Sequence, residues 1–110
     1  MTRKEVINAL EAARNKLLTE KNKEEFKGWT RTIQYHFTDT DDVWHFKVQN
    51  GIPSEWIHSE AENPDIVFKW TEDTFLGIMS GTINGMKTFM AGKVKVKASM
   101  KDISKMQKLM

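Results

Sequence analysis

The side chains best suited to acid–base or metal chemistry are three histidines, and they stand far apart in the chain. His36, His45 and His58 fall in separate predicted strands, without the paired spacing of a zinc-binding helix. Isolated histidines are more often structural or solvent-exposed than catalytic. The chain contains no cysteine, which excludes thiolate nucleophiles and sulfur ligands for a metal. We therefore predict no catalytic residue, no metal and no cofactor, and we expect that the protein is not an enzyme.

Two short motifs approach known ligand loops but fail on spacing. Asp39, Asp41 and Asp42 resemble the first half of a calcium-binding loop, but the glycine and the final glutamate of such a loop are missing. Gly81 and Gly85 are too close together for a phosphate-binding P-loop, and no lysine follows the second glycine directly. Turn propensity explains the first motif, and helix caps and turns explain the second.

The elements that position the remaining side chains are clearest in the stretch 71–100. Thr71 is typical of a helix start, because its hydroxyl oxygen can accept a free backbone N–H. An apolar stripe at helical spacing follows and ends at Gly81. Asn84-Gly85 then indicates a turn before a second, shorter helix. From Lys93 onward valine and lysine alternate, which predicts a half-buried strand.

Five residues of this stretch keep a recognisable spacing: Asp73, Phe75, Gly81, Gly92 and Lys93. They fall on a capped helix, its glycine stop, a short helix and a Gly-Lys pair that opens the alternating strand. This run resembles the signature of the sterol carrier protein 2 (SCP2) family of lipid-binding domains. The resemblance implies a lipid-binding tunnel between the sheet and the C-terminal helices.

The rest of the chain predicts one helix and four strands before this stretch. The predicted strands cover residues 29–37, 43–48, 55–59 and 66–70, and a C-terminal helix covers 103–110. Asn50-Gly51 is a strong hairpin signal, and Pro53 makes the third strand irregular or places it at an edge. We therefore predict a single α+β domain over residues 1–110, with a five-stranded, mostly antiparallel sheet covered on one face by helices.

Methionines gather in the C-terminal part of the chain, where six of the seven lie between Met79 and Met110. Methionine is flexible and suits surfaces that must accept varied apolar shapes. Apolar stripes at helical spacing usually fill a core, whereas the SCP2 resemblance favours a tunnel. On the second interpretation the candidate ligand-binding residues are Trp44, Phe46, Phe68, Trp70, Phe75, Ile78, Met79, Met86, Phe89, Met90, Ile103, Met106 and Met110.

The charge of the chain is unevenly distributed. The formal net charge is only +2, which is too balanced for a typical nucleic-acid-binding protein. From Lys87 onward there are seven lysines and one acid, Asp102. An alternating lysine face protects a strand from pairing with another molecule. The same lysines could instead attract the protein to an anionic membrane or to acyl-CoA phosphates.

The SCP2 resemblance implies a non-catalytic carrier of a hydrophobic small molecule. The ligand would be a fatty acid, an acyl-CoA, a sterol-like molecule or an isoprenoid. Two alternatives stay open: a module that uses the same groove to bind a partner protein or a second copy, and an accessory domain that delivers lipid to a separate enzyme. The N-terminus lacks a hydrophobic signal core, so we expect a cytoplasmic protein.

Overall fold

The structure is a computed structural model, and it describes residues 3–107. The elements, in chain order, are α1 (Lys4–Asn15), the 3₁₀ turn η1 (Lys16–Leu18), α2 (Glu20–Glu25), β1 (Arg31–Phe37), β2 (Asp42–Gln49), β3 (Ile52–Pro53), β4 (Ile66–Trp70), α3 (Glu72–Ser80), α4 (Gly85–Met90), β5 (Lys95–Lys97) and α5 (Met100–Gln107). The α+β class predicted from the sequence is confirmed.

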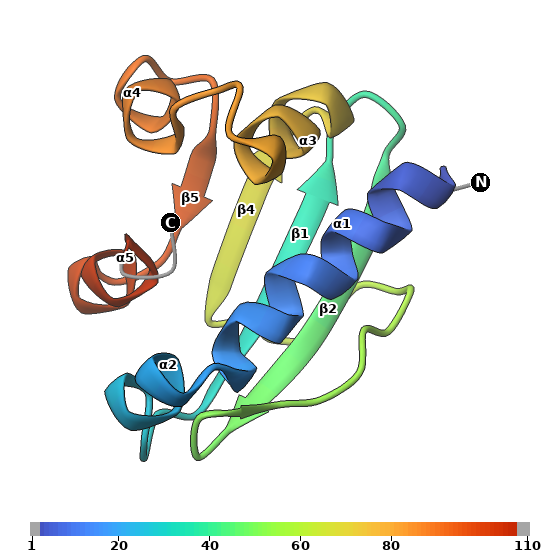
Figure 1. Cartoon of the computed structure of the whole chain (residues 1–110). Helices are drawn as coiled ribbons and strands as arrows, with labels where there is room; N and C mark the ends of the chain where they lie inside the picture. The colour runs from blue at the N-terminus through green and yellow to red at the C-terminus, as the bar shows by residue number, and fades with distance from the viewer. Residues whose placement is uncertain (1–2, 108–110) are drawn as a thin grey trace.

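The five strands form one sheet in the order β3-β2-β1-β4-β5. The β1 and β4 strands run parallel, and the other neighbours run antiparallel. Helices α1 and α3 contact each other over one face of the sheet, while α4 and α5 lie beside the β5 edge (Figure 1). The mostly antiparallel sheet with helices over one face is therefore as predicted.

Alternation along β1 decides which side chains face the helices. Ile33 and Phe37 are fully buried, and Tyr35 between them is nearly so. Because neighbouring strands are in register, Tyr35 lies between Trp44 of β2 and Phe68 of β4. Side chains that are paired across strands share a face, so this row of aromatic rings lies on the side that the helices cover.

The β2–β3 hairpin forms where Asn50-Gly51 predicted it. Both residues have positive φ, 53° and 78°, as the tight two-residue hairpin turn requires. A side chain on Gly51 would also place its Cβ 2.6 Å from the backbone oxygen of Phe26. The turn is thus packed against the connection that follows α2.

The predicted third strand at residues 55–59 is wrong. The pairing with β2 stops at Pro53, and beyond it a single bridge joins Ile57 to His45. Proline has no N–H to donate to a ladder, so a long loop replaces the strand. The short helix α2 was not predicted, although Thr19 caps it by accepting a hydrogen bond from the N–H of Asn22 at 3.3 Å.

The central stretch follows the prediction with two adjustments. Thr71 caps α3 by accepting from the N–H of Thr74 at 3.2 Å, and Gly81 ends it with φ of 82°. Asn84 does not form a free turn but caps α4, accepting from the N–H of Lys87 at 3.0 Å. The last strand begins at Lys95, two residues later than expected.

Candidate functional site

A cavity of about 600 Å³ lies between the sheet and the helices that pack beside it. Its lining comes from α1, η1, β1, β4, α3, α4, α5 and the α3–α4 loop. The lining residues are Ala13, Lys16, Tyr35, Phe68, Trp70, Phe75, Ile78, Met79, Gly81, Ile83, Asn84, Gly85, Met86, Met106 and Gln107. Lys16 is the one charged residue in this lining, so the cavity is suited to an apolar guest.

A smaller void of about 30 Å³ adjoins the cavity toward β5 and α5. The two spaces share lining residues on β4, α3, α4 and α5, and the smaller one adds Phe89, Val94, Val96 and Ile103. It is much smaller than the main cavity.

The floor of the cavity is a cluster of aromatic rings, three from the sheet and one, Phe75, from α3. Tyr35 lies at its centre, with ring centroids 4.9 Å from Trp70, 5.3 Å from Phe68 and 5.5 Å from Phe75. All four side chains are buried. Offset and edge-on contacts of this kind are favoured between aromatic rings, so the four rings pack together as one apolar surface.

The exposed lining residues mark the opening. Asn84, at the start of α4, and Gln107, at the end of α5, are exposed. Met86 on α4 is 41% exposed. The cavity therefore opens to solvent between α4 and the end of α5.

Two polar groups belong to the buried part of the lining. The indole Nε1 of Trp70 is buried and has no hydrogen-bond partner among the residues that the structure describes. Burial raises the pKa of Tyr35 above its ordinary value, because the charged phenolate would lose its hydration. The Tyr35 hydroxyl therefore stays protonated under physiological conditions.

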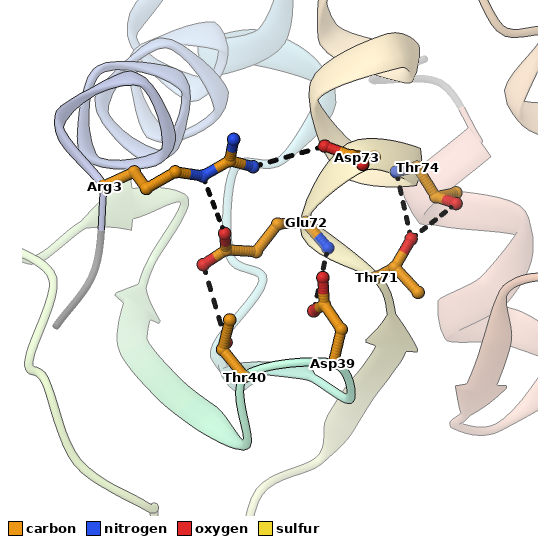
Figure 2. Close-up of polar contacts among 7 residues, drawn as sticks. All are labelled: Arg3, Asp39, Thr40, Thr71, Glu72, Asp73 and Thr74. Atoms are coloured by element: carbon orange, nitrogen blue, oxygen red, sulfur yellow. Dashed lines mark hydrogen bonds and ion pairs between the residues drawn. The ribbon is translucent and has the colours of Figure 1, made fainter.

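Buried ionic contacts fix the helices around the cavity. Glu72, at the start of α3, is 3% exposed and accepts a hydrogen bond from Arg3 Nε at 2.9 Å (Figure 2). Its backbone N–H donates to Asp39 at 3.2 Å, in the β1–β2 turn. The hydrogen bond to Asp73, and to a smaller extent the one to Glu72, raises the pKa of Arg3. These contacts tie α3 to both α1 and the sheet.

Asp102 anchors the first turn of α5 in a comparable way. Its carboxylate is buried and accepts from Arg31 Nε at 3.0 Å and from Trp29 Nε1 at 3.3 Å. Its backbone N–H donates to Ser99 Oγ at 3.1 Å. The N-terminal half of α5 is thus fastened to β1, while Met106 farther along contributes to both cavities.

The structure brings most of the predicted ligand-binding residues together. Those that line one of the two spaces are Phe68, Trp70, Phe75, Ile78, Met79, Met86, Phe89, Ile103 and Met106. That they bind a ligand stays a prediction. Three others lie outside the lining: Trp44 stacks on His58, Phe46 packs against Trp56, and Met90 is 80% exposed. Met110 lies outside the described residues.

Sequence reasoning missed several lining residues, of which Tyr35 is the most important. The sequence did contain a signal for it, because Tyr35 lies two residues from both Ile33 and Phe37 and so shares the inner face of the strand with them. Ala13 and Lys16 gave no such signal, because their place in the lining depends on how α1 crosses the sheet.

The histidines form no shared site. His36 pairs with Asp41, His58 with Asp42, and His45 contacts the backbone oxygen of Ser59. Within residues 3–107, no group of three or more histidine, cysteine, aspartate and glutamate side chains could hold a metal ion.

A cavity with this lining, on a sheet with this order, can be compared with known protein families. The model of the SCP-2 sterol transfer family matches residues 8–110. This chain belongs to that family. The resemblance seen in the sequence is therefore confirmed, and membership supports a lipid-binding carrier role for this SCP2 chain. No curated protein matches the chain.

Solved structures share the SCP2 fold at low sequence identity. Palmitated SCP2L2 from Aedes aegypti is 13% identical with a TM-score of 0.73, over 99% of this chain and 94% of that one. The UbiJ-SCP2 ubiquinone synthesis protein is 6% identical with a TM-score of 0.67, over 94% and 90%. The sec-alkylsulfatase Pisa1 from Pseudomonas sp. is 20% identical with a TM-score of 0.63; the match covers 79% of this chain but 13% of the sulfatase. These likenesses show the fold alone.

The helices of this SCP2 chain are short. Among residues 3–107, no helix has the length and apolar character needed to cross a membrane.

Proposed function

We propose that this SCP2 chain is a non-catalytic carrier that holds one lipid molecule in the cavity above the aromatic floor. The observation that carries the proposal is the cavity itself, about 600 Å³ with a single charged lining residue. Small-molecule sites in proteins have volumes of about 300–1,000 Å³ and mostly apolar walls. Membership of a sterol transfer family supports a lipid as the guest.

Binding would be driven by desolvation. Each methylene group that moves from water into the cavity gains about 0.8 kcal/mol. The flexible side chains of Met79, Met86 and Met106 allow the walls to adapt to different chain shapes. We propose a fatty acid, an acyl-CoA, a sterol-like molecule or an isoprenoid as the ligand class; a palmitated relative and a ubiquinone synthesis protein share the fold.

The proposed route in and out passes the end of α5. Asp102 fastens the first turn of this helix, whereas Gln107 at its other end is exposed beside the opening. Displacing the C-terminal half of α5 would widen the opening and keep the contacts of Asp102, but it would break the hydrogen bond from Lys105 to the backbone oxygen of Glu25. The helix would then act as a lid hinged near Asp102.

Native mass spectrometry of gently purified protein tests the carrier proposal. A discrete added mass, identified as a lipid after organic extraction, is the expected result. Protein that carries no added mass, and that also fails to take up a fluorescent fatty-acyl probe, would contradict it.

A second candidate function is protein–protein interaction through the same groove, including homodimer formation. Exposed Met86 and Met90 on α4 favour it, since methionine-rich surfaces suit helical partners. Light scattering over a range of concentrations would then show a rise in mass that added lipid does not reverse.

An accessory role beside an enzyme is a third candidate. The sulfatase match supports it, because the SCP2-like part there is a small portion of a larger enzyme chain. A purified separate enzyme would then turn over lipid faster when this chain is added, while this chain alone would show no turnover of acyl-CoA.

The lysine-rich end of the chain supports transient contact with an anionic membrane during loading. Lys93, Lys95 and Lys97 are all exposed, and each lysine close to such a surface contributes about 1 kcal/mol. The cytoplasmic location stays a prediction that cell fractionation would test.

A further inference from the structure

Helices α1 and α3 lie over one face of the sheet (Figure 1), and we call the opposite face the open face. Gln34 and His45 are paired across β1 and β2 and belong to the open face, because they alternate with the inner aromatic residues of these strands. Residues 54–65, the crossing segment, join β3 to β4, which are separated by β2 and β1. The N–H of Ala61 donates to Gln34 Oε1 at 2.8 Å, and the backbone oxygen of Ser59 lies 2.7 Å from His45 Nδ1. The crossing segment therefore passes over the open face.

The crossing segment makes one half of the open face acidic. Its acids Glu60, Glu62 and Asp65 are all exposed, and it contains no lysine or arginine. Glu60 and Glu62 flank Ala61, so their backbone lies over β1. Asp65 is held beside the same strand, because its N–H donates to the backbone oxygen of Thr32 and its carboxylate accepts from the N–H of Thr32 at 2.8 Å. The negative charge thus has a defined place on this face.

The other half of the open face, over β4 and β5, is basic. Val67 is opposite Gln34 of β1 and Lys97 is opposite Val67, while Lys95 is opposite Lys69. The three lysines therefore share the open face, and all three are exposed. Within residues 3–107 none of them forms an ion pair. Like charges directly opposite each other on neighbouring strands are destabilising, so Lys69 and Lys95 would gain from an acidic partner.

An acidic half and a basic half side by side make the open face complementary to itself. A rotation of 180° about an axis between the two halves sets the acidic half of each copy on the basic half of the other. Two-fold contacts of this kind are the commonest in homo-oligomers. We infer that a second copy of this chain docks on the open face, where the lysines Lys69, Lys95 and Lys97 of each copy meet Glu60 and Glu62 of the other.

Charge favours a second copy over a membrane as the occupant of the whole face. A membrane can approach the lysines from the β5 edge, but an anionic surface laid flat on the open face would repel the crossing segment. A second copy meets both halves with the opposite charge. Because membrane contact and self-association would both use Lys95 and Lys97, membrane-bound chains would be monomers. The inference does not depend on what the cavity holds.

Analytical ultracentrifugation of the full chain tests this, over a range of protein and salt concentrations. The unaltered protein should form a dimer at low salt, and the dimer should weaken as salt rises, because salt screens exposed charges. One variant makes the open face wholly acidic by Lys69→Glu, Lys95→Glu and Lys97→Glu. A second variant makes it wholly basic by Glu60→Lys and Glu62→Lys.

Each variant alone should dimerise at least about tenfold more weakly than the unaltered protein, because like charges would then face each other. The two variants mixed should pair with each other, since one face is then acidic and the other basic. The control carries Lys4→Glu, Lys21→Glu and Lys23→Glu on α1 and α2, with the same change in charge as the triple lysine variant, and should dimerise normally. Circular dichroism checks folding, and the glutamate variant tests the same contact should the lysine variant fail to fold.

Three results would overturn the inference: protein that stays monomeric at every concentration in low salt, a dimer that neither salt nor the charge reversals weaken, and variants that fail to pair on mixing. The first would leave the lysines to the anionic membrane. The second would place the dimer contact on another surface, such as the opening between α4 and α5. The carrier function would stand in each case, because the added lipid mass tests it separately.

Discussion

Tyr35 is the one tyrosine of the chain and lies at the centre of the aromatic floor. Its hydroxyl therefore reports on the floor without interference from other tyrosines. Burial raises its pKa in the folded protein, whereas the unfolded chain releases this proton near the ordinary value of about 10. Below that pH the hydroxyl is neutral in both states, and its ionisation does not lower the free energy of unfolding. As the pH rises above it, the unfolded state gains by ionising and the free energy of unfolding falls.

We predict that tyrosinate absorbance will not appear near pH 10 while the protein stays folded. It should appear there in denaturant, and in the folded protein only at higher pH or on unfolding. An ultraviolet absorbance titration with and without denaturant measures both. Ionisation at the ordinary pKa in the folded protein would mean that water fills the floor around Tyr35.

At the scale of the element, the first turn of α5 is anchored to the sheet, while the other end of the helix lines the cavity. Asp102 holds the first turn through Arg31 and Trp29. Lys105, next to Met106 near the other end, adds a second contact by donating to the backbone oxygen of Glu25 and lying over the ring of Phe26. Met106 is 8% exposed and lines both spaces. Anchoring and ligand contact are therefore separable by mutation.

Met106→Arg should block lipid uptake in a folded protein. The new guanidinium would either enter the apolar cavity, which costs free energy, or hold α5 away from the sheet. A fluorescent fatty-acyl probe measures uptake, and circular dichroism checks folding. Met90→Arg places the same side chain on an 80% exposed position of α4 and should bind as the unaltered protein does. Equal uptake by folded Met106→Arg would exclude α5 as the lid.

Asp102→Ala should loosen the lid at its hinge. Removing the carboxylate leaves the donors of Arg31 and Trp29 without their acceptor, at a cost of about 1–3 kcal/mol in the free energy of unfolding. Urea unfolding measures the loss, and amide hydrogen exchange should rise in α5 more than in α1. Lys101→Ala, at the neighbouring exposed position, is the control. Equal exchange in both variants would show that the anchor does not hold α5.

At the scale of the whole molecule, positive charge is concentrated in the C-terminal part of the chain. The alternating lysines of β5 and the exposed Met86 and Met100 lie in the same C-terminal part of the chain. Charge attracts such a surface to anionic lipid, and the exposed methionines give it apolar side chains that can enter the headgroup region.

Replacing Lys93, Lys95 and Lys97 together with glutamate should weaken binding to anionic phospholipid vesicles by about a hundredfold. Binding of the unaltered protein should also fall as salt rises, because salt screens exposed charges. Vesicle co-sedimentation measures both effects. The control makes the same charge change at Lys4, Lys21 and Lys23, which are exposed on α1 and α2. Equal loss in both variants would show an effect of net charge without a docking face.

Apart from α2 and the third strand, the order of elements could be predicted from the sequence because local signals set it. Thr71, Gly81 and Asn50-Gly51 adopt the cap and turn geometries that their chemistry favours. Which residues line the cavity depends on how the side chains pack in three dimensions, and local sequence signals do not give this. Trp44 and Phe46 alternate as inner residues should, but His58 and Trp56 from the long loop cover them.

Both outer strands of the sheet are short. The β3 strand has two residues, one of them Pro53 without an N–H, and β5 has three, two of them exposed lysines. Neither offers a second copy a continuous row of backbone groups to extend the sheet. Edge-to-edge pairing of two copies is therefore disfavoured, and the helical side, where α4 and α5 frame the opening, is one surface left for self-association. A dimer built there would cover the opening of the cavity and enclose its contents, so lipid exchange would slow as the protein concentration rose.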